Sequence, residues 1–181
     1  FGTVRPTFAA TPRRGRVIAA KAIVLVVFAA LLQIVVVAVC VFGGRALAQH
    51  RGATIDLGSA ANGGVDLIAP LVGVLVLTVF AALLGLGVGM LMRSTPLSIT
   101  TLVLWPLLVE GLLSGLIFVI TKNEKSTFWL PFRAGLRLAM VGGVGMGSDA
   151  GPSRLQAGFY FGAVSVALTL LGAWAVRRRD A

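Results

Sequence analysis

Acidic residues are scarce in this chain of 181 residues, in which six Asp and Glu stand against sixteen Lys and Arg. Charged residues make up 12%, whereas a soluble domain has about 25%. The mean hydropathy is +0.97. These values exclude an ordinary soluble domain and indicate an integral membrane protein. The formal charge of +10 does not point to nucleic acid, because the arginines lie at the ends of apolar runs and form no basic face interleaved with aromatics.

Cysteine and histidine are nearly missing, with one residue of each kind. Cys40 alone cannot form an intrachain disulfide, and no Cys/His cluster has the spacing of a metal site. Cys40 lies inside an apolar run, where it is expected to act as a small hydrophobe. His50 is expected to be solvated in a polar loop. We therefore predict no metal and no cofactor on this chain.

Motifs for catalysis and nucleotide binding are also missing. The chain has no GxxxxGK[ST], HExxH, CxxC or GxSxG. The glycines of residues 142–147 match GxGxxG loosely, but no strand precedes them, which argues against a nucleotide fingerprint. Glu110 is the one carboxylate inside a long apolar run, and catalysis by carboxylates usually needs two. We expect this chain not to be an enzyme.

Long apolar runs are what the sequence does contain. A transmembrane helix needs about 20 mostly apolar residues, and four runs meet this length, at about 22–42, 67–92, 96–120 and 155–176. The turn between the second and third runs, from Arg93 to Pro96, is short and predicts antiparallel neighbours. The predicted fold is all-α: a polytopic membrane protein with one membrane domain, a polar loop at 43–66 and an outer segment at 121–154.

The third run contains a proline and a carboxylate. Pro106 removes a backbone donor and crowds the carbonyl four residues earlier, so it predicts a kink. Leu102, Pro106, Glu110 and Ser114 are four apart and share one face. A carboxylate in a span costs about 2.5–3.5 kcal/mol on insertion scales, so this face should point into the bundle.

Polar residues at comparable depth are the expected partners of Glu110, namely Gln33, Thr78 and Thr169. Two interpretations remain open. Glu110, with Pro106 and Gln33, is either part of a transport pathway or gate, or the donor or acceptor of a structural hydrogen bond. In the second run, Gly85, Gly87 and Gly89 favour close helix packing through small residues over a flexible point.

The outer segment begins polar and continues with aromatics suited to a membrane interface, such as Trp129. Residues 131–140 are long enough for a short helix but not for a span. The Gly/Pro-rich stretch 142–152 predicts a break between two short helices.

Residues 1–21 are basic and carry no acid. A basic segment next to a span is typical of the cytoplasmic side. With four spans, residue 1 and residue 181 are then both expected on the cytoplasmic side. A short surface helix is predicted near Val4–Ala10, followed by a break at Pro12 and a basic elbow. On residue chemistry alone, the favoured interpretation is a basic juxtamembrane segment that binds anionic lipid.

Residues 2–21, GTVRPTFAATPRRGRVIAAK, resemble the cytoplasmic loop of bacterial type-2 ABC exporter permeases, in which a "GT-R-T--ATP-RGR---AK" pattern includes the coupling helix. Leu130-Pro131-Phe132 with Ala134 and Leu136 is similar to the family's outer "LPF-A---L" segment of re-entrant or interfacial helices. The closing residues 174–181, WAVRRRDA, resemble the family's Arg-rich end. The resemblance covers patches from one end to the other.

This resemblance implies a permease subunit of an ATP-driven exporter in the bacterial plasma (inner) membrane. Two further spans would precede Phe1. ATP, Mg²⁺ and hydrolysis would belong to a partner ABC ATPase, and a second permease chain, identical or homologous, would complete the pathway within the lipid bilayer. The residues implied to dock on the ATPase are Thr3, Arg5, Thr7, Thr11, Arg13, Arg14 and Arg16.

Two other classes stay open. One is a non-transport scaffold or assembly subunit of a membrane complex. The other is a small membrane enzyme acting on lipid, which would need a second polar cluster near Glu110.

Overall fold

The computed structural model describes residues 14–52, 67–92, 94–122, 127, 129–141 and 152–179. The described elements are helical, and four helices are long and apolar enough to cross a membrane, at Gly15–His50, Ile68–Met92, Thr95–Thr121 and Arg154–Arg178. The all-α prediction and the four predicted spans are confirmed. The predicted helix at Val4–Ala10 and the break at Pro12 lie outside the described residues.

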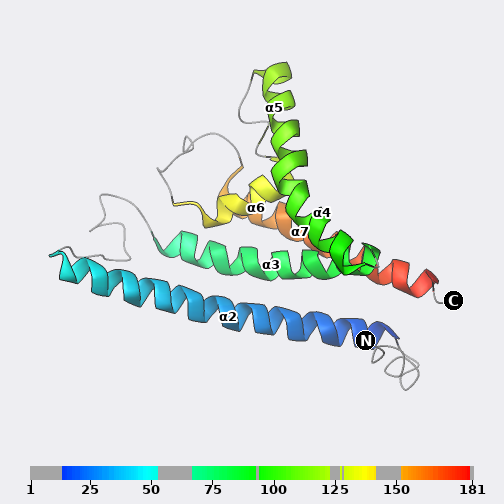
Figure 1. The fold of residues 1–181 in the computed structure, drawn as a ribbon, viewed down its shortest axis with the longest axis horizontal. Helices are drawn as coiled ribbons and strands as arrows, with labels where there is room; N and C mark the ends of the chain where they lie inside the picture. Colours follow the sequence, from blue (N-terminus) through cyan, green and yellow to red (C-terminus); the bar gives the residue numbers. More distant parts are fainter. Residues whose placement is uncertain are drawn as a thin grey trace.

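Helix α2, Arg14–His50, is longer than its apolar run at both ends (Figure 1). The basic elbow expected before Ala22 is helical from Arg14 onward. The prediction of a loop from Gly43 is wrong for residues 43–50, which are helical. The residues after Gly44 are mostly good helix formers and continue the helix. Gly52 then adopts a φ of 71°, and its N–H donates to Gln49 O at 3.0 Å, as in a left-handed helix cap.

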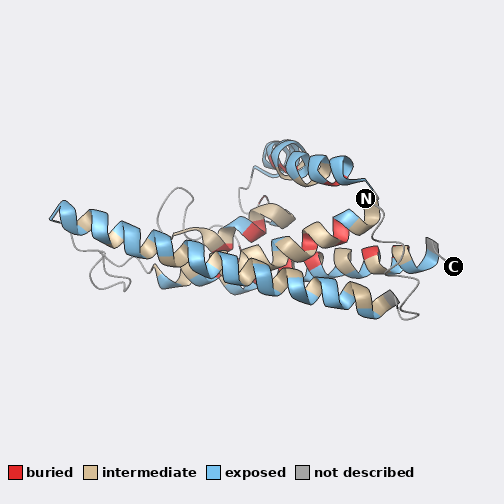
Figure 2. Ribbon diagram, turned by 60° about the horizontal axis from the view of Figure 1, so that its bottom comes forward, coloured by how far each residue is buried: buried red, intermediate tan, exposed pale blue. Residues whose placement is uncertain are grey.

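Helices α3, Ile68–Met92, and α7, Arg154–Arg179, form the most extensive helix pair. Their backbones meet at Gly87, where an added Cβ would lie 2.7 Å from Leu168 C. The close packing predicted for this glycine is confirmed. Gly85 has only Leu102 Cδ1 nearby, at 3.9 Å, and Gly89 has no atom within 4 Å, so close packing does not explain these two. Figure 2 shows that buried residues are few, and α2 contributes none of those described.

The third span is built from α4, Thr95–Leu104, a π-turn η1, Trp105–Val109, and α5, Glu110–Thr121. The disturbance expected at Pro106 takes the form of this π-turn, in which the Glu110 N–H donates to Trp105 O. Helix α4 packs against α3, whereas α5 leads away from α3 and α7 (Figure 1). Of the four residues predicted to share one face, Glu110 and Ser114 are buried, and Leu102 and Pro106 are partly buried.

Helix α6, Pro131–Ala139, is a short helix within the range 131–140 in which one was expected. Nine residues span about 13 Å, which is too short to cross a bilayer. It packs against α3 and α7 through Ala134, Gly135 and Leu138, which are buried. The Leu138 carbonyl group rests directly on Gly73 of α3. The second short helix expected in this segment lies outside the described residues.

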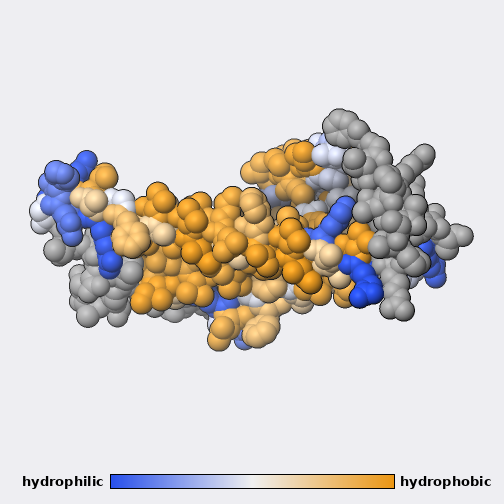
Figure 3. Space-filling model, turned by 90° about the horizontal axis from the view of Figure 1, so that it is seen from below, coloured by the Kyte–Doolittle hydropathy of each residue, from blue (hydrophilic) through white to orange (hydrophobic). Residues whose placement is uncertain are grey.

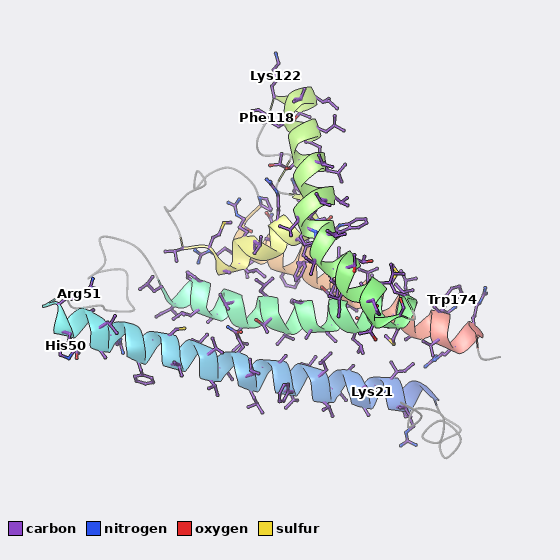
Figure 4. The ribbon with its side chains drawn as sticks, in the orientation of Figure 1. Lys21, His50, Arg51, Phe118, Lys122 and Trp174 are labelled. Atoms are coloured by element: carbon purple, nitrogen blue, oxygen red, sulfur yellow. The ribbon has the colours of Figure 1, made fainter. Side chains whose placement is uncertain are left out.

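The first turn of α2 and the last turn of α7 lie at the same end of the bundle, where the Arg177 guanidinium contacts Gly15. Lys21 and Trp174 also lie toward this end, and His50 and Arg51 lie at the other end of α2 (Figure 4). We call the end that holds the first turn of α2 and the last turn of α7 the basic end. Figure 3 shows a broad apolar band between hydrophilic ends, as expected for helices in a bilayer.

Candidate functional site

Glu110 is the most completely buried charged side chain described, with 1% of its surface exposed. Its two carboxylate oxygens accept backbone N–H groups from the start of α6. The Phe132 N–H donates to Oε1 at 2.8 Å, and the Arg133 N–H donates to Oε2 at 3.1 Å. Glu110 therefore joins the third span to α6 through two hydrogen bonds.

The start of α6 needs such a partner because the first N–H groups of a helix have no intrahelical acceptor. Leu130 occupies the N-cap position with an extended backbone and makes no side-chain cap. Pro131 follows and has no N–H to satisfy. The next two amides are those that Glu110 accepts. A carboxylate at this position also interacts favourably with the positive end of the helix dipole.

The junction between Glu110 and α6 is enclosed by apolar side chains. The Phe132 ring packs edge-on against Phe161 with centroids 6.1 Å apart, and Phe161 is 1% exposed. Ser114, one turn after Glu110, turns its hydroxyl to Gly111 O at 2.8 Å. Hydrogen bonds are electrostatically stronger in such a water-poor setting, and unpaired groups are costlier.

The π-turn helps to place this carboxylate. In an α-helix of 3.6 residues per turn, side chains four residues apart differ in direction by about 40° around the helix axis. A π-turn takes about one more residue per turn and offsets this difference between Leu102 and Glu110. Pro106, predicted as part of a pathway, is partly buried and lies inside this turn. It lies one turn before Glu110.

The side chains predicted to pair with Glu110 have other partners. The Thr78 hydroxyl of α3 lies 3.2 Å from Gln33 Oε1 of α2 and 2.9 Å from Val74 O. The Thr169 hydroxyl lies 2.8 Å from both Leu83 O and Ser165 O. The predicted pairings were wrong because backbone amides, which every residue carries, satisfied the carboxylate instead. Leu130-Pro131-Phe132 was the available sequence signal, since proline commonly occupies the first position of a helix.

The docking residues are only partly within the described chain. Arg14 is the first residue of α2, and Arg16 is exposed in its first turn. The remainder of the predicted set, Thr3 to Arg13, lies outside the described residues. Among the residues described, no three His, Cys, Asp or Glu side chains are placed to hold a metal ion.

Comparison of the chain with protein families, with curated proteins and with solved structures found no match. Its function therefore has to be inferred from its own residues and geometry.

The Gln33–Thr78 contact leads to a stability prediction. Thr78→Val removes the polar partner of Gln33 between α2 and α3, and we expect a loss of about 0.6–1.7 kcal/mol, the range for hydrogen bonds between membrane helices. The measurement is thermal unfolding in detergent. Thr100→Val is the matched control, because the Thr100 hydroxyl is exposed and bonds only within its own helix, to Pro96 O. Equal losses in both variants would show that the interhelical contact contributes nothing.

Proposed function

We propose that this chain is a membrane-spanning permease subunit of an ATP-driven ABC exporter, with ATP hydrolysis on a separate ATPase chain. The observation that best supports this is the continuity of α2 from Arg14 to His50. Its 37 residues correspond to about 55 Å, well beyond the roughly 30 Å of a hydrocarbon core. A displacement applied to residues 2–21, which overlap the first turns of α2, would thus be transmitted along an entire span.

The basic end is proposed to face the cytoplasm of a bacterium. Arg16, Lys21, Arg177 and Arg178 lie at this end, and lysine and arginine favour the cytoplasmic side. Residues 1–21 would then dock on the ATPase. A second permease chain and membrane lipid would cover the exposed apolar side chains of α5, which include Leu112, Leu116 and Val119.

Helix α6 is proposed to enter the bilayer from the opposite, outer face. Gly135 lies beside Leu77 of α3, which is nine residues after Ile68 and so about 13 Å into that helix. Leu138 lies beside Gly73, about 7 Å into α3. A helix start at such depth requires protein acceptors, because lipid offers none. Glu110 is one, so movement of α5 would carry α6 with it, as a gate would require.

Charge reversal tests the docking role. The double change Arg13→Glu and Arg14→Glu is expected to reduce co-purification of the ATPase by about tenfold or more, since like charges at an interface cost several kcal/mol. ATP hydrolysis stimulated by the permease should fall in parallel. Arg178→Glu with Arg179→Glu is the matched control, because it makes the same charge change at the same end outside the motif.

The same experiment separates a transporter from a scaffold. A permease should couple ATP hydrolysis to export in sealed vesicles, and the motif variant should lose both. Unchanged ATPase binding and export in the Arg13/Arg14 variant would reject docking through these residues. ATPase binding without any coupled export in the wild-type chain would favour the scaffold.

A further inference from the structure

A groove of about 580 Å³ lies at the end of the bundle opposite the basic end, between the first turns of α3, the second half of α6 and the start of α7. It is lined by apolar side chains, among them Val72, Phe80, Leu138 and Phe159. Gly73 and Gly158 allow Leu138 to lie close to α3 and α7 and so form part of the floor. The groove is an apolar furrow with one charged residue, Arg154, in its lining.

The position of Arg154 is set by the start of α7. Ser153 and Gln156 form a reciprocal cap: the Ser153 N–H donates to Gln156 Oε1 at 3.0 Å, and the Gln156 N–H lies 3.3 Å from Ser153 Oγ. This capping box makes Arg154 the first helical residue. The guanidinium donates from Nη2 to Met140 O at 2.9 Å. Arginine has five N–H donors, so this bond anchors the group and leaves donors for a ligand.

Arg154 and the N-terminus of α7 place positive charge at this end of the groove. A cation at a helix N-terminus adds to the positive end of the helix dipole. The sole acid among the described residues is Glu110, whose oxygens accept the amides of α6. The site thus favours an anion.

The rim of the groove faces the surroundings of the bundle. Val72 is 57% exposed, Leu155 76% and Phe159 80%, which in a membrane chain places them against acyl chains. Arg154 is the first residue of the fourth candidate span, Arg154–Arg178, and an arginine at the end of a span lies near the membrane interface. An apolar furrow in the hydrocarbon region thus ends at a cation near the interface.

We propose that this groove binds one anionic phospholipid, with an acyl chain along the furrow and the phosphate on Arg154. Arginine suits this role because its planar fork matches phosphate oxygens in a bidentate manner. The proposal does not rest on the exporter assignment, because it uses only the groove, its charge and its level in the membrane.

Native mass spectrometry of the full chain in detergent tests the site, with phosphatidylglycerol or phosphatidylcholine titrated as probes. The wild-type chain should bind phosphatidylglycerol more tightly. Arg154→Gln should weaken its binding about fivefold to tenfold, from the loss of one interfacial charge, and leave phosphatidylcholine unchanged. Arg154→Lys keeps the charge and should retain most of the preference, which separates a binding effect from misfolding. Arg178→Gln, at the basic end, should have no effect.

The groove itself is tested by Val72→Trp, which fills it from an exposed position without entering the core. Binding of both lipids at this site should fall. Retained phosphatidylglycerol preference in Arg154→Gln would overturn the proposal, as would an equal loss in Arg178→Gln, which would show general electrostatic attraction. Unchanged binding of both lipids in Val72→Trp would place the lipid elsewhere.

Discussion

Replacing Glu110 by alanine is expected to release α6 from the third span. The change removes both acceptors and leaves the Phe132 and Arg133 amides buried without partners. Hydrogen bonds to a charged group contribute about 1.5–3 kcal/mol each, and unsatisfied buried donors cost about 1–3 kcal/mol. Allowing for partial relaxation, we expect a loss of about 3–5 kcal/mol. Glu110→Gln should lose less stability than Glu110→Ala but should be less stable than the wild type. Its carbonyl can accept one amide N–H, while its NH₂ group opposes the other.

Alkylation of a cysteine placed at Leu138 measures this release directly. Leu138 is 7% exposed, and with Cys40 replaced by serine the new cysteine is the single reporter. In membranes, this cysteine should react slowly with a maleimide when Glu110 is retained. The reaction should be at least about tenfold faster in Glu110→Ala, since 1.4 kcal/mol already changes an opening equilibrium tenfold. Thermal unfolding in detergent gives an independent reading.

Ser114→Ala is the matched control, one turn away on the same buried face. Its hydroxyl bonds only to Gly111 O of its own helix, so removing it should cost less than about 1 kcal/mol. Unchanged labelling and melting in Glu110→Ala would refute the capping role. A Glu110→Gln variant that melts like the wild type but does not export would instead favour a direct role of the carboxylate in the pathway.

Gly87→Ala is expected to push α3 and α7 apart. The new Cβ would lie 2.7 Å from Leu168 C and Thr169 N, both backbone atoms that cannot rotate away. Overpacking of this kind costs about 1–3 kcal/mol, and it also strains the bond from the Thr169 hydroxyl to Leu83 O. Thermal unfolding in detergent should show the loss.

Gly89→Ala is the control for the backbone itself. It lies two residues further along the same helix and has open space around it, so its stability should be unchanged or slightly raised by better helix propensity. Gly172→Ala should mimic Gly87→Ala, because its Cβ would lie 2.7 Å from Gly87 O. The double variant should be less than additive, since one displacement relieves both contacts. Equal losses at Gly87 and Gly89 would argue against the packing explanation.

The sequence by itself determined the membrane class, the four spans and the all-helical fold. These follow from the transfer free energy of apolar runs about 20 residues long and from the need of a backbone in lipid to satisfy its own hydrogen bonds. The disturbance at Pro106 and the short helix at Pro131 were also predictable, because proline lacks a backbone donor wherever it occurs. The burial of Glu110 followed from the cost of exposing a carboxylate to lipid.

Tertiary structure alone decided what Glu110 binds and which glycine matters. Backbone amides are the same at every residue, so no composition or spacing identifies the two that meet a carboxylate 22 and 23 positions earlier in the chain. Gly85, Gly87 and Gly89 read alike in sequence, and only the approach of α7 to Gly87 distinguishes them. The extension of α2 to His50 was missed for a related reason. The apolar run predicts which residues lie in the hydrocarbon region, whereas the helix continues beyond that region wherever its residues favour helix formation.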